Sequence, residues 1–98
     1  MRYDFEWDNQ KAKANIRKHK ISFERATTIF RDRNLLSTPD EEHSEFEERW
    51  ITLGFDESGK ILVLSHKFES VSHGVSRIRI ISARKATKKE TEQYEEGI

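Results

Sequence analysis

The sequence predicts an α+β fold in which a strand and two helices precede an antiparallel sheet, and a C-terminal helix follows it. Three patterns carry this prediction. Aromatic residues alternate with polar ones in the first seven positions, apolar residues then recur at helical spacing up to residue 30, and residues 34–84 hold consecutive strand patterns. Strands that follow one another without intervening helices are typical of α+β folds. At 98 residues the chain, residues 1–98, is expected to form a single small domain.

The N-terminal third is expected to form one strand and two helices. The strand is indicated by alternating aromatic residues at Tyr3, Phe5 and Trp7. Asp8 is suited to cap a first helix, whose residues 11–18 carry a narrow apolar stripe and a strongly basic opposite face. Ser22 is suited to cap a second helix, whose apolar residues share one face: Phe23, Ala26, Ile29 and Phe30.

The remaining elements are mostly strands. Residues 34–38 form a weak strand, and residues 50–55 and 61–68 are expected to pair as a hairpin. The second strand of this hairpin begins Ile-Leu-Val-Leu without alternation, so it should lie at the centre of the sheet with both faces covered. Residues 69–74 are expected to be a flexible connection to the last strand, residues 77–84.

A C-terminal helix and a core complete the predicted fold. Thr87 and Glu90 have the spacing of a capping box, which opens a polar helix through Tyr94. The predicted core is composed of large apolar residues from both helices and the strands: Trp7, Phe23, Ile29, Phe30, Ile51, Leu53, Leu62 and Leu64.

The formal net charge is zero, but the charges are unevenly distributed. Residues 40–57 hold eight acids and one base, residues 77–89 hold six bases and no acid, and residues 11–25 hold six bases and one acid. Two interpretations stay open. If the fold brings the two basic stretches together, the protein presents a positive face that attracts a polyanion. Alternatively, the acidic and basic stretches pair with each other.

Several functional classes lack the residues they need. The absence of cysteine excludes disulfides and thiolate chemistry and favours a reducing compartment. The chain has no Gly-flanked serine, no glycine-rich phosphate loop and no histidine pair at zinc spacing. The longest apolar run, residues 61–64, is too short to span a bilayer, so a cytoplasmic location is expected. The acids of residues 40–45 suit a hard cation but lack a glycine-organised ligand spacing, so we expect no metal or other cofactor.

The last predicted strand is rich in arginine. Strict alternation places Arg77 and Arg79 on one face with Ala83, and Arg84 on the other face. Two guanidinium groups on one face suit phosphates, but they suit the acids of residues 40–57 equally well. Arg84 also has a structural interpretation as a clamp on the C-terminal helix or its acids.

Histidines are the remaining candidates for proton transfer. His19 is suited to close the first helix through the helix dipole, or to act as a catalyst. His43 lies in the acidic loop, where it is either simply exposed or able to reach a ligand. His66 and His73 have weaker claims.

An ordered set of short motifs resembles the BrnT family of bacterial toxins. The matching residues cover nearly the whole chain: Phe5-Glu6-Trp7-Asp8, Lys11-Ala12, Asn15, Lys18-His19, Ser22-Phe23-Glu24, Ala26, Asp40, His43-Ser44, Glu48-Arg49-Trp50, Leu53-Gly54, the run from Arg77 to Arg84, Ala86-Thr87, Glu90 and Tyr94. Two features depart from the family pattern. The family usually has a glycine where this chain has Lys20, and the connection over residues 67–76 is longer than usual.

The resemblance implies a RelE-like fold and a ribonuclease activity that blocks translation. It also implies a cognate BrnA-like antitoxin, whose ribbon-helix-helix domain would bind operator DNA, so that the toxin meets DNA only indirectly. In such a ribonuclease the ribose 2′-hydroxyl is the nucleophile, so neither a metal ion nor a protein nucleophile is needed. The competing interpretation is a catalytically inactive module that only binds nucleic acid or antitoxin.

Within that mechanism, the residues of this chain have expected roles. Arg79 and Arg84 would stabilise the charge that builds on the phosphate. His43 or His19 would move protons. The other basic residues at matching positions would hold the flanking phosphates of the RNA: Lys18, Arg49 and Arg77. Arg49 shares a strand face with Ile51 and Leu53, so a structural role is the alternative for this residue.

Overall fold

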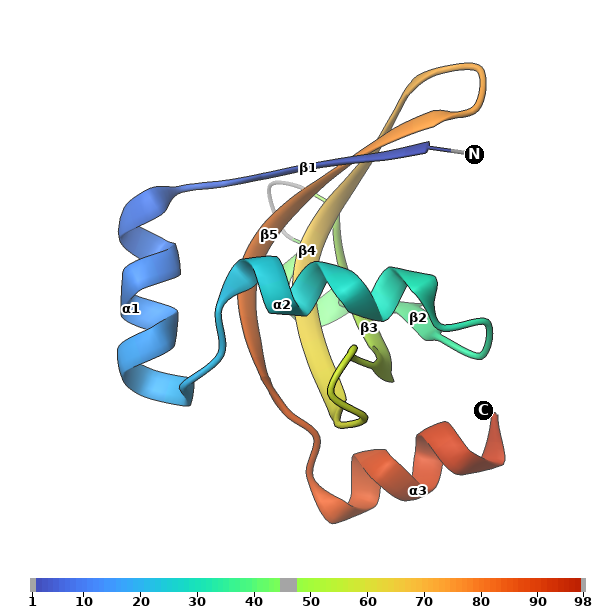
Figure 1. The fold of residues 1–98 in the computed structure, drawn as a ribbon. Helices are drawn as coiled ribbons and strands as arrows, with labels where there is room; N and C mark the ends of the chain where they lie inside the picture. The colour runs from blue at the N-terminus through green and yellow to red at the C-terminus, as the bar shows by residue number, and fades with distance from the viewer. Residues whose placement is uncertain (1, 45–47, 98) are drawn as a thin grey trace.

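The computed structural model describes residues 2–44 and 48–97 (Figure 1). Their elements follow in the order β1 (Arg2–Trp7), α1 (Asn9–His19), α2 (Phe23–Thr27), the 3-10 helix η1 (Thr28–Arg31), β2 (Leu36–Pro39), the 3-10 helix η2 (Glu41–His43), β3 (Arg49–Phe55), β4 (Ile61–Ser72), β5 (Val75–Lys85) and α3 (Lys88–Glu96). The expected α+β class is confirmed. The second helix is shorter than expected, because η1 continues it as a tighter turn.

The five strands form one sheet in the order β1-β5-β4-β3-β2. β4 is central, as its unbroken apolar run predicted. β2 to β5 pair antiparallel, but β1 pairs parallel with β5, so the expectation of a wholly antiparallel sheet is wrong at that edge. The physical reason is that almost the whole chain separates β1 from β5, so no tight hairpin fixes their relative direction.

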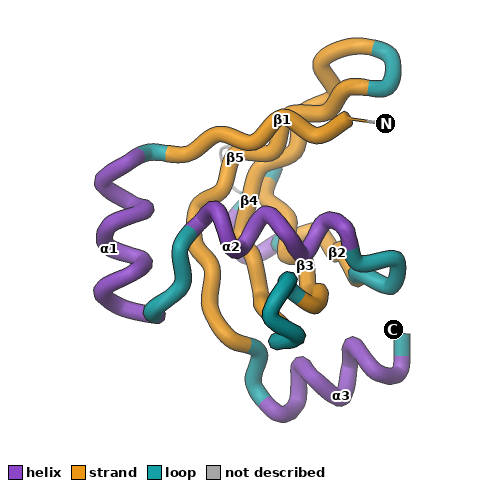
Figure 2. Tube along the Cα trace, viewed as in Figure 1, coloured by secondary structure: helices purple, strands orange, loops and turns teal. Residues whose placement is uncertain are grey.

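The expected flexible connection over residues 69–74 is also wrong. β4 continues to Ser72 and β5 starts at Val75, so the two strands form a long hairpin that projects from the body of the molecule (Figures 1 and 2). Gly74 has a φ of 76°, a left-handed conformation that glycine adopts without steric cost and that tight hairpin turns require. The extra residues relative to the BrnT pattern therefore lengthen a strand pair.

Helices lie over both faces of the sheet. We call one face the α2 face, because Phe23 and Ala26 of α2 pack there in a cluster with strand residues such as Leu62 and Ile78. The opposite face carries Val63, which packs with Tyr94 of α3. Of the predicted core, five residues are buried, namely Phe23, Ile29, Leu53, Leu62 and Leu64, whereas Trp7, Phe30 and Ile51 are half-buried.

The predicted helix caps are confirmed. Asp8 accepts hydrogen bonds from the N–H groups of residues 10 and 11, Ser22 caps α2, and Thr87 with Glu90 forms the full capping box of α3. α1 ends at Lys20, which has a φ of 62°. A lysine therefore stands in the left-handed conformation that the glycine of the family pattern would adopt more easily.

Asn15 joins α1 to the sheet. β1 covers the edge of β5 only as far as the pair Trp7 and Ile80. Beyond it, the buried Asn15 amide donates to the carbonyl oxygen of Ala83 at 2.8 Å and accepts from its N–H at 3.1 Å, as a neighbouring strand would. The same amide donates to the carbonyl of Ile21. One side chain thus satisfies backbone groups that burial would otherwise leave unpaired.

None of the helices in the described part of the chain is long and apolar enough to cross a membrane.

Candidate functional site

Three basic residues stand in register across three neighbouring strands. Arg49 of β3 is paired with Lys67 of β4, and Lys67 is paired with Arg79 of β5. Register partners point to the same side of a sheet, and adjacent strands are about 4.8 Å apart. The three side chains therefore form a row on the side opposite the α2 face. We call that side, which carries Arg49, Lys67, Arg77 and Arg79, the basic face.

The arginines of β5 have acidic neighbours, but not the expected ones. Arg77 donates to Glu69 of β4 at 3.0 Å, and the Arg79 guanidinium lies 3.7 Å from the carboxylate of Glu6 on β1. All four side chains are more than two-fifths exposed. Exposed ion pairs of this kind contribute little stability, so a phosphate can replace the carboxylate at small cost. None of the described acids in residues 40–57 is a partner of these two arginines.

The acidic and basic stretches do meet at one point. Arg25 donates to the buried carboxylate of Asp56 at 2.5 Å, which links the end of α2 to the turn between β3 and β4. The pairing interpretation of the charge pattern is therefore correct for this pair, whereas Arg77 and Arg79 stay on an open strand surface.

One irregularity changes the direction of every later residue in β5. Ser82 pairs with Ser65 of β4. The next pair toward the start of β5 is Ile80 with His66, so Ile81 has no partner in β4. An extra residue of this kind is a β-bulge, which shifts the alternation of side chains by one position.

The bulge corrects the expectation for Ala83 and Arg84. Ala83 packs with the core cluster of the α2 face, and Arg84 is paired with Val63 on the other side. Arg84 therefore lies on the same side as Arg79, whereas strict alternation predicted opposite sides. A bulge cannot be read from residue types alone, because it depends on the pairing of β5 with β4.

Arg84 is held by the C-terminal helix. Its guanidinium donates to both carboxylate oxygens of Glu90, at 2.7 and 2.8 Å. This hydrogen bonding lowers the pKa of Glu90 to about 2 and raises the pKa of Arg84. The clamp interpretation of Arg84 is confirmed, and α3 is held a second time by a hydrogen bond from the Tyr94 hydroxyl to Asp32.

His43 lies beside the start of β3. Its Nδ1 is 2.9 Å from an Asp40 carboxylate oxygen, and Asp40 donates its backbone N–H to the carbonyl of Arg49. The imidazole is mostly exposed. Asp40 therefore fixes one ring nitrogen of His43, and its backbone hydrogen bond to Arg49 holds this part of the loop beside the first residue of β3.

Lys18 and His19 lie on the last turn of α1, which packs beside β5 at the edge of the sheet (Figure 1). They are not strand residues of the basic face. His66 is buried on the α2 face, where burial lowers its pKa, and His73 is exposed in the turn of the long hairpin.

Sequence reasoning missed Lys67. Lys67 follows the apolar run of β4. Because apolar and polar residues do not alternate in that run, the sequence does not show which side of the sheet each residue faces. Only its register with Arg49 and Arg79 shows that it lies on the basic face.

The acidic loop brings three possible metal ligands together. Ligand atoms of Asp40, Glu42 and His43 lie within 4.8 Å of one another. The hydrogen bond between Asp40 and His43 accounts for most of this proximity.

These features define a small α+β protein with a row of cationic side chains across three strands of its sheet. The sequence profile described as "Ribonuclease toxin, BrnT, of type II toxin-antitoxin system" matches residues 7–90. The chain belongs to this BrnT family, and membership implies a cognate antitoxin. The 1.1 Å crystal structure of the Brucella abortus ribonuclease toxin BrnT has a similar fold, with a TM-score of 0.64 and 19% sequence identity over 90% of this chain and 100% of that chain. A search of curated protein sequences found no significant match.

Proposed function

We propose that this protein is a toxin that cleaves RNA without a metal ion and so inhibits translation, and that a BrnA-like ribbon-helix-helix antitoxin neutralises it. The observation that carries the proposal is the row of Arg49, Lys67 and Arg79, which stand in register on one side of the sheet. Neighbouring phosphates of one RNA strand carry a series of negative charges, which such a row complements.

The chemistry assigned to the row is charge stabilisation. The 2′-oxygen of a ribose loses its proton to a base and attacks the adjacent phosphorus, and negative charge builds on the non-bridging oxygens. The bond to the 5′-oxygen then breaks, and that oxygen takes a proton from an acid and leaves as a hydroxyl group. Donors that are held in place before the reaction stabilise this charge most effectively. Arg79 stands at one end of the row and is assigned this role, whereas Lys67, Arg49 and Arg77 hold the phosphates on either side.

Proton transfer is assigned to His43. Asp40 accepts the Nδ1 proton of His43, which leaves Nε2 to accept the proton of the 2′-hydroxyl. The exposure of the imidazole allows RNA to approach it. His19 is the second candidate, and with Lys18 it would contact RNA that extends past β5 to α1.

Arg84 must exchange its Glu90 partner for a phosphate before it contributes to catalysis. Its guanidinium is occupied by Glu90, so a phosphate reaches it only by replacing that carboxylate. The same observation supports the alternative function, an inactive module that binds RNA or antitoxin. In the free protein Arg77, Arg79 and Arg84 each have a carboxylate partner.

Incubation of the purified protein with RNA in the presence of a chelator distinguishes the two functions. The proposal expects cleavage that leaves 2′,3′-cyclic phosphate ends, and a cell-free translation reaction that stops at the same protein concentration. Arg79→Ala should weaken both effects by roughly 10²-fold, while Arg33→Ala, at an exposed arginine in the loop before β2, should leave them unchanged. RNA binding without cleavage would favour the inactive module.

A further inference from the structure

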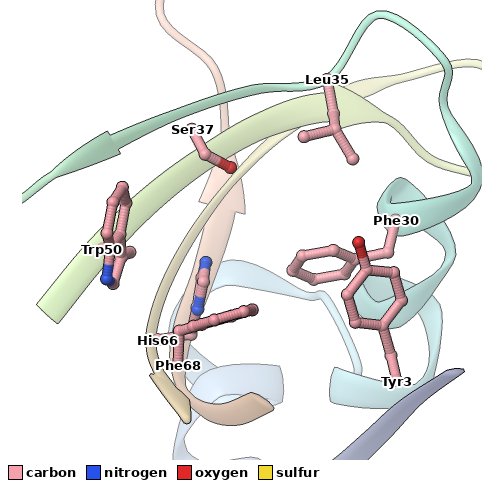
Figure 3. Close-up of a pocket in the computed structure, with 7 residues that line it drawn as sticks. All are labelled: Tyr3, Phe30, Leu35, Ser37, Trp50, His66 and Phe68. Carbon is pink, nitrogen blue, oxygen red and sulfur yellow. The ribbon is translucent and has the colours of Figure 1, made fainter. Parts of the chain in front are cut away.

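An aromatic pocket opens on the α2 face, at the end of the sheet near the long hairpin. Its volume is about 160 Å³, and its walls are mostly apolar: Tyr3, Phe30, Leu35, Trp50 and Phe68. Figure 3 shows Trp50 on one side of the space and the rings of Phe30 and Tyr3 on the other. The pocket lies on the opposite side of the sheet from the arginine row.

A chain of hydrogen bonds forms the polar part of the wall. The Nδ1–H of His66 donates to the carbonyl of Lys67 at 3.2 Å, so the neutral ring accepts at Nε2 from the Thr52 hydroxyl at 2.7 Å. Thr52 in turn accepts from the Ser37 hydroxyl at 2.7 Å. Burial lowers the pKa of His66, which keeps the ring neutral. The hydroxyl protons of both Ser37 and Thr52 are used within this chain.

The hydrogen bonding of the pocket wall indicates which kind of group can bind in the pocket. Among the described residues no buried side-chain polar atom lacks a hydrogen-bond partner, so the buried His66 and Thr52 offer no unpaired group to a polar ligand. A nucleobase would lose the hydrogen bonds that its ring nitrogens and exocyclic groups make with water. An apolar side chain loses none. The volume is close to that of an apolar cavity of about 150 Å³ that holds one benzene ring, so one aromatic or branched aliphatic side chain fits.

Charges at one end of the pocket indicate what carries this side chain. Trp50 is paired with Pro39, and the chain then continues into Asp40, Glu41 and Glu42. The exposed carboxylates of Glu41 and Glu42 attract a basic segment of a protein. Phe68, which is 42% exposed, adds exposed apolar surface at the edge of the pocket. Exposed apolar surface next to a pocket is typical of protein interfaces.

We infer that this pocket anchors one apolar side chain from a basic segment of the cognate antitoxin. The inference rests on the proposed function only for the identity of the partner. It separates two tasks of the antitoxin, because attachment takes place on the α2 face while inhibition requires the basic face to be covered. An anchor in a mostly apolar pocket is the kind of contact that dominates the binding energy of an interface.

The test uses two phenylalanines with nearly equal exposure. Phe68, at 42%, lines the pocket, and Phe55, at 43%, packs against Tyr94 of α3. Calorimetric titration with the protein encoded by the adjacent gene gives the dissociation constant. Phe68→Ala should weaken binding about tenfold or more, the loss expected for one anchor contact. Phe68→Leu should restore most of the affinity, and Phe55→Ala should change it less than twofold.

Thermal unfolding and RNA cleavage are measured on the same preparations. All three variants should unfold near the wild-type temperature and cleave RNA at the wild-type rate, because none removes a cationic residue of the basic face. Equal antitoxin affinity in wild type and Phe68→Ala, or no binding by the wild type, overturns the inference. A variant that loses RNA affinity and keeps antitoxin affinity also overturns it, since the pocket would then be a base site. If the wild type does not cleave RNA but Phe68 still controls antitoxin binding, the ribonuclease proposal fails and the anchor site stands.

Charge reversal at the acidic end of the pocket tests whether the partner segment is basic. Glu41→Lys combined with Glu42→Lys should weaken binding of the same antitoxin severalfold at low salt, and the difference from wild type should disappear at high salt because exposed charges are screened. A salt-independent loss, or none, would contradict a basic partner segment.

Discussion

The two faces of the sheet are built from the same strands but have opposite chemistry. On β4, Leu64 and His66 are buried on the α2 face, while Lys67, the next residue, stands in the row of the basic face. On β5, Ile80 is buried and Arg79 is two-fifths exposed. Neighbouring residues of one strand therefore have different roles: one is buried and stabilises the fold, and the next is exposed and available to a ligand. Substitutions of fully buried residues on the α2 face should destabilise the protein, whereas substitutions in the row of the basic face should change its chemistry with little loss of stability.

The largest loss of stability is expected on the α2 face. Phe23 is fully buried and makes an edge contact with Trp7 at 5.9 Å between ring centres. Phe23→Ala should lower the free energy of unfolding by about 3 to 5 kcal/mol, which approaches the whole stability of a small protein. Urea unfolding measures this loss, with the exposed Phe55→Ala as the matched control. A Phe23→Ala protein as stable as the control would disprove the packing of α2 on the sheet.

A smaller loss is expected at the junction of α1 and β5. Asn15→Ala removes three hydrogen bonds and leaves the buried backbone groups of Ala83 without their partner. The expected cost is about 1 to 3 kcal/mol. Hydrogen exchange of the Ala83 amide should accelerate in Asn15→Ala and stay slow in Asn34→Ala, an exposed control. Unchanged protection of that amide would show that the Asn15 bridge is not needed.

Acid should weaken the end of the molecule where α3 meets the basic face. The hydrogen bond from Arg84 lowers the pKa of Glu90 in the folded state to about 2 from its ordinary value of 4.5. The pair therefore stabilises the fold fully above about pH 4.5, and this contribution is lost as the pH falls toward 2. Urea unfolding at pH 5 and pH 3 should show a steeper loss in wild type than in Glu90→Gln. Parallel losses would mean that the pair contributes no pH dependence.

The smallest effect is a gain in stability at the end of α1. Lys20 adopts a left-handed conformation, which glycine adopts without steric cost. Lys20→Gly should therefore raise the free energy of unfolding by up to about 1 kcal/mol. Lys13→Gly, inside the same helix, should instead lower it by about the same amount. If both substitutions destabilise the protein, the strain at Lys20 is negligible.

Local signals in the sequence predicted the elements well. Asp8, Ser22 and Thr87 cap the helices as expected, because a cap depends only on residues within one turn. The unbroken apolar run of residues 61–64 likewise placed β4 at the centre of the sheet.

Features that depend on pairing between distant strands escaped prediction. The parallel direction of β1, the bulge at Ile81 and the position of Lys67 each require the register of two strands. Because the bulge was not foreseen, Arg84 was placed on the wrong side of β5. The family resemblance supplied candidate residues, but only the register shows that Arg49 and Arg79 stand in one row with Lys67.

The central claim is that Arg79 acts on the reacting phosphate, whereas Lys18 only holds RNA at a distance. Single-turnover cleavage and RNA affinity, measured across a salt series with metal chelated, separate these roles. Arg79→Ala should lower the cleavage rate by roughly 10²-fold with little loss of affinity, the scale of losing one preorganised donor. Lys18→Ala should weaken binding and reduce its salt dependence, with the cleavage step unchanged. Equal losses of affinity alone in both variants would contradict the account and make Arg79 only another phosphate contact.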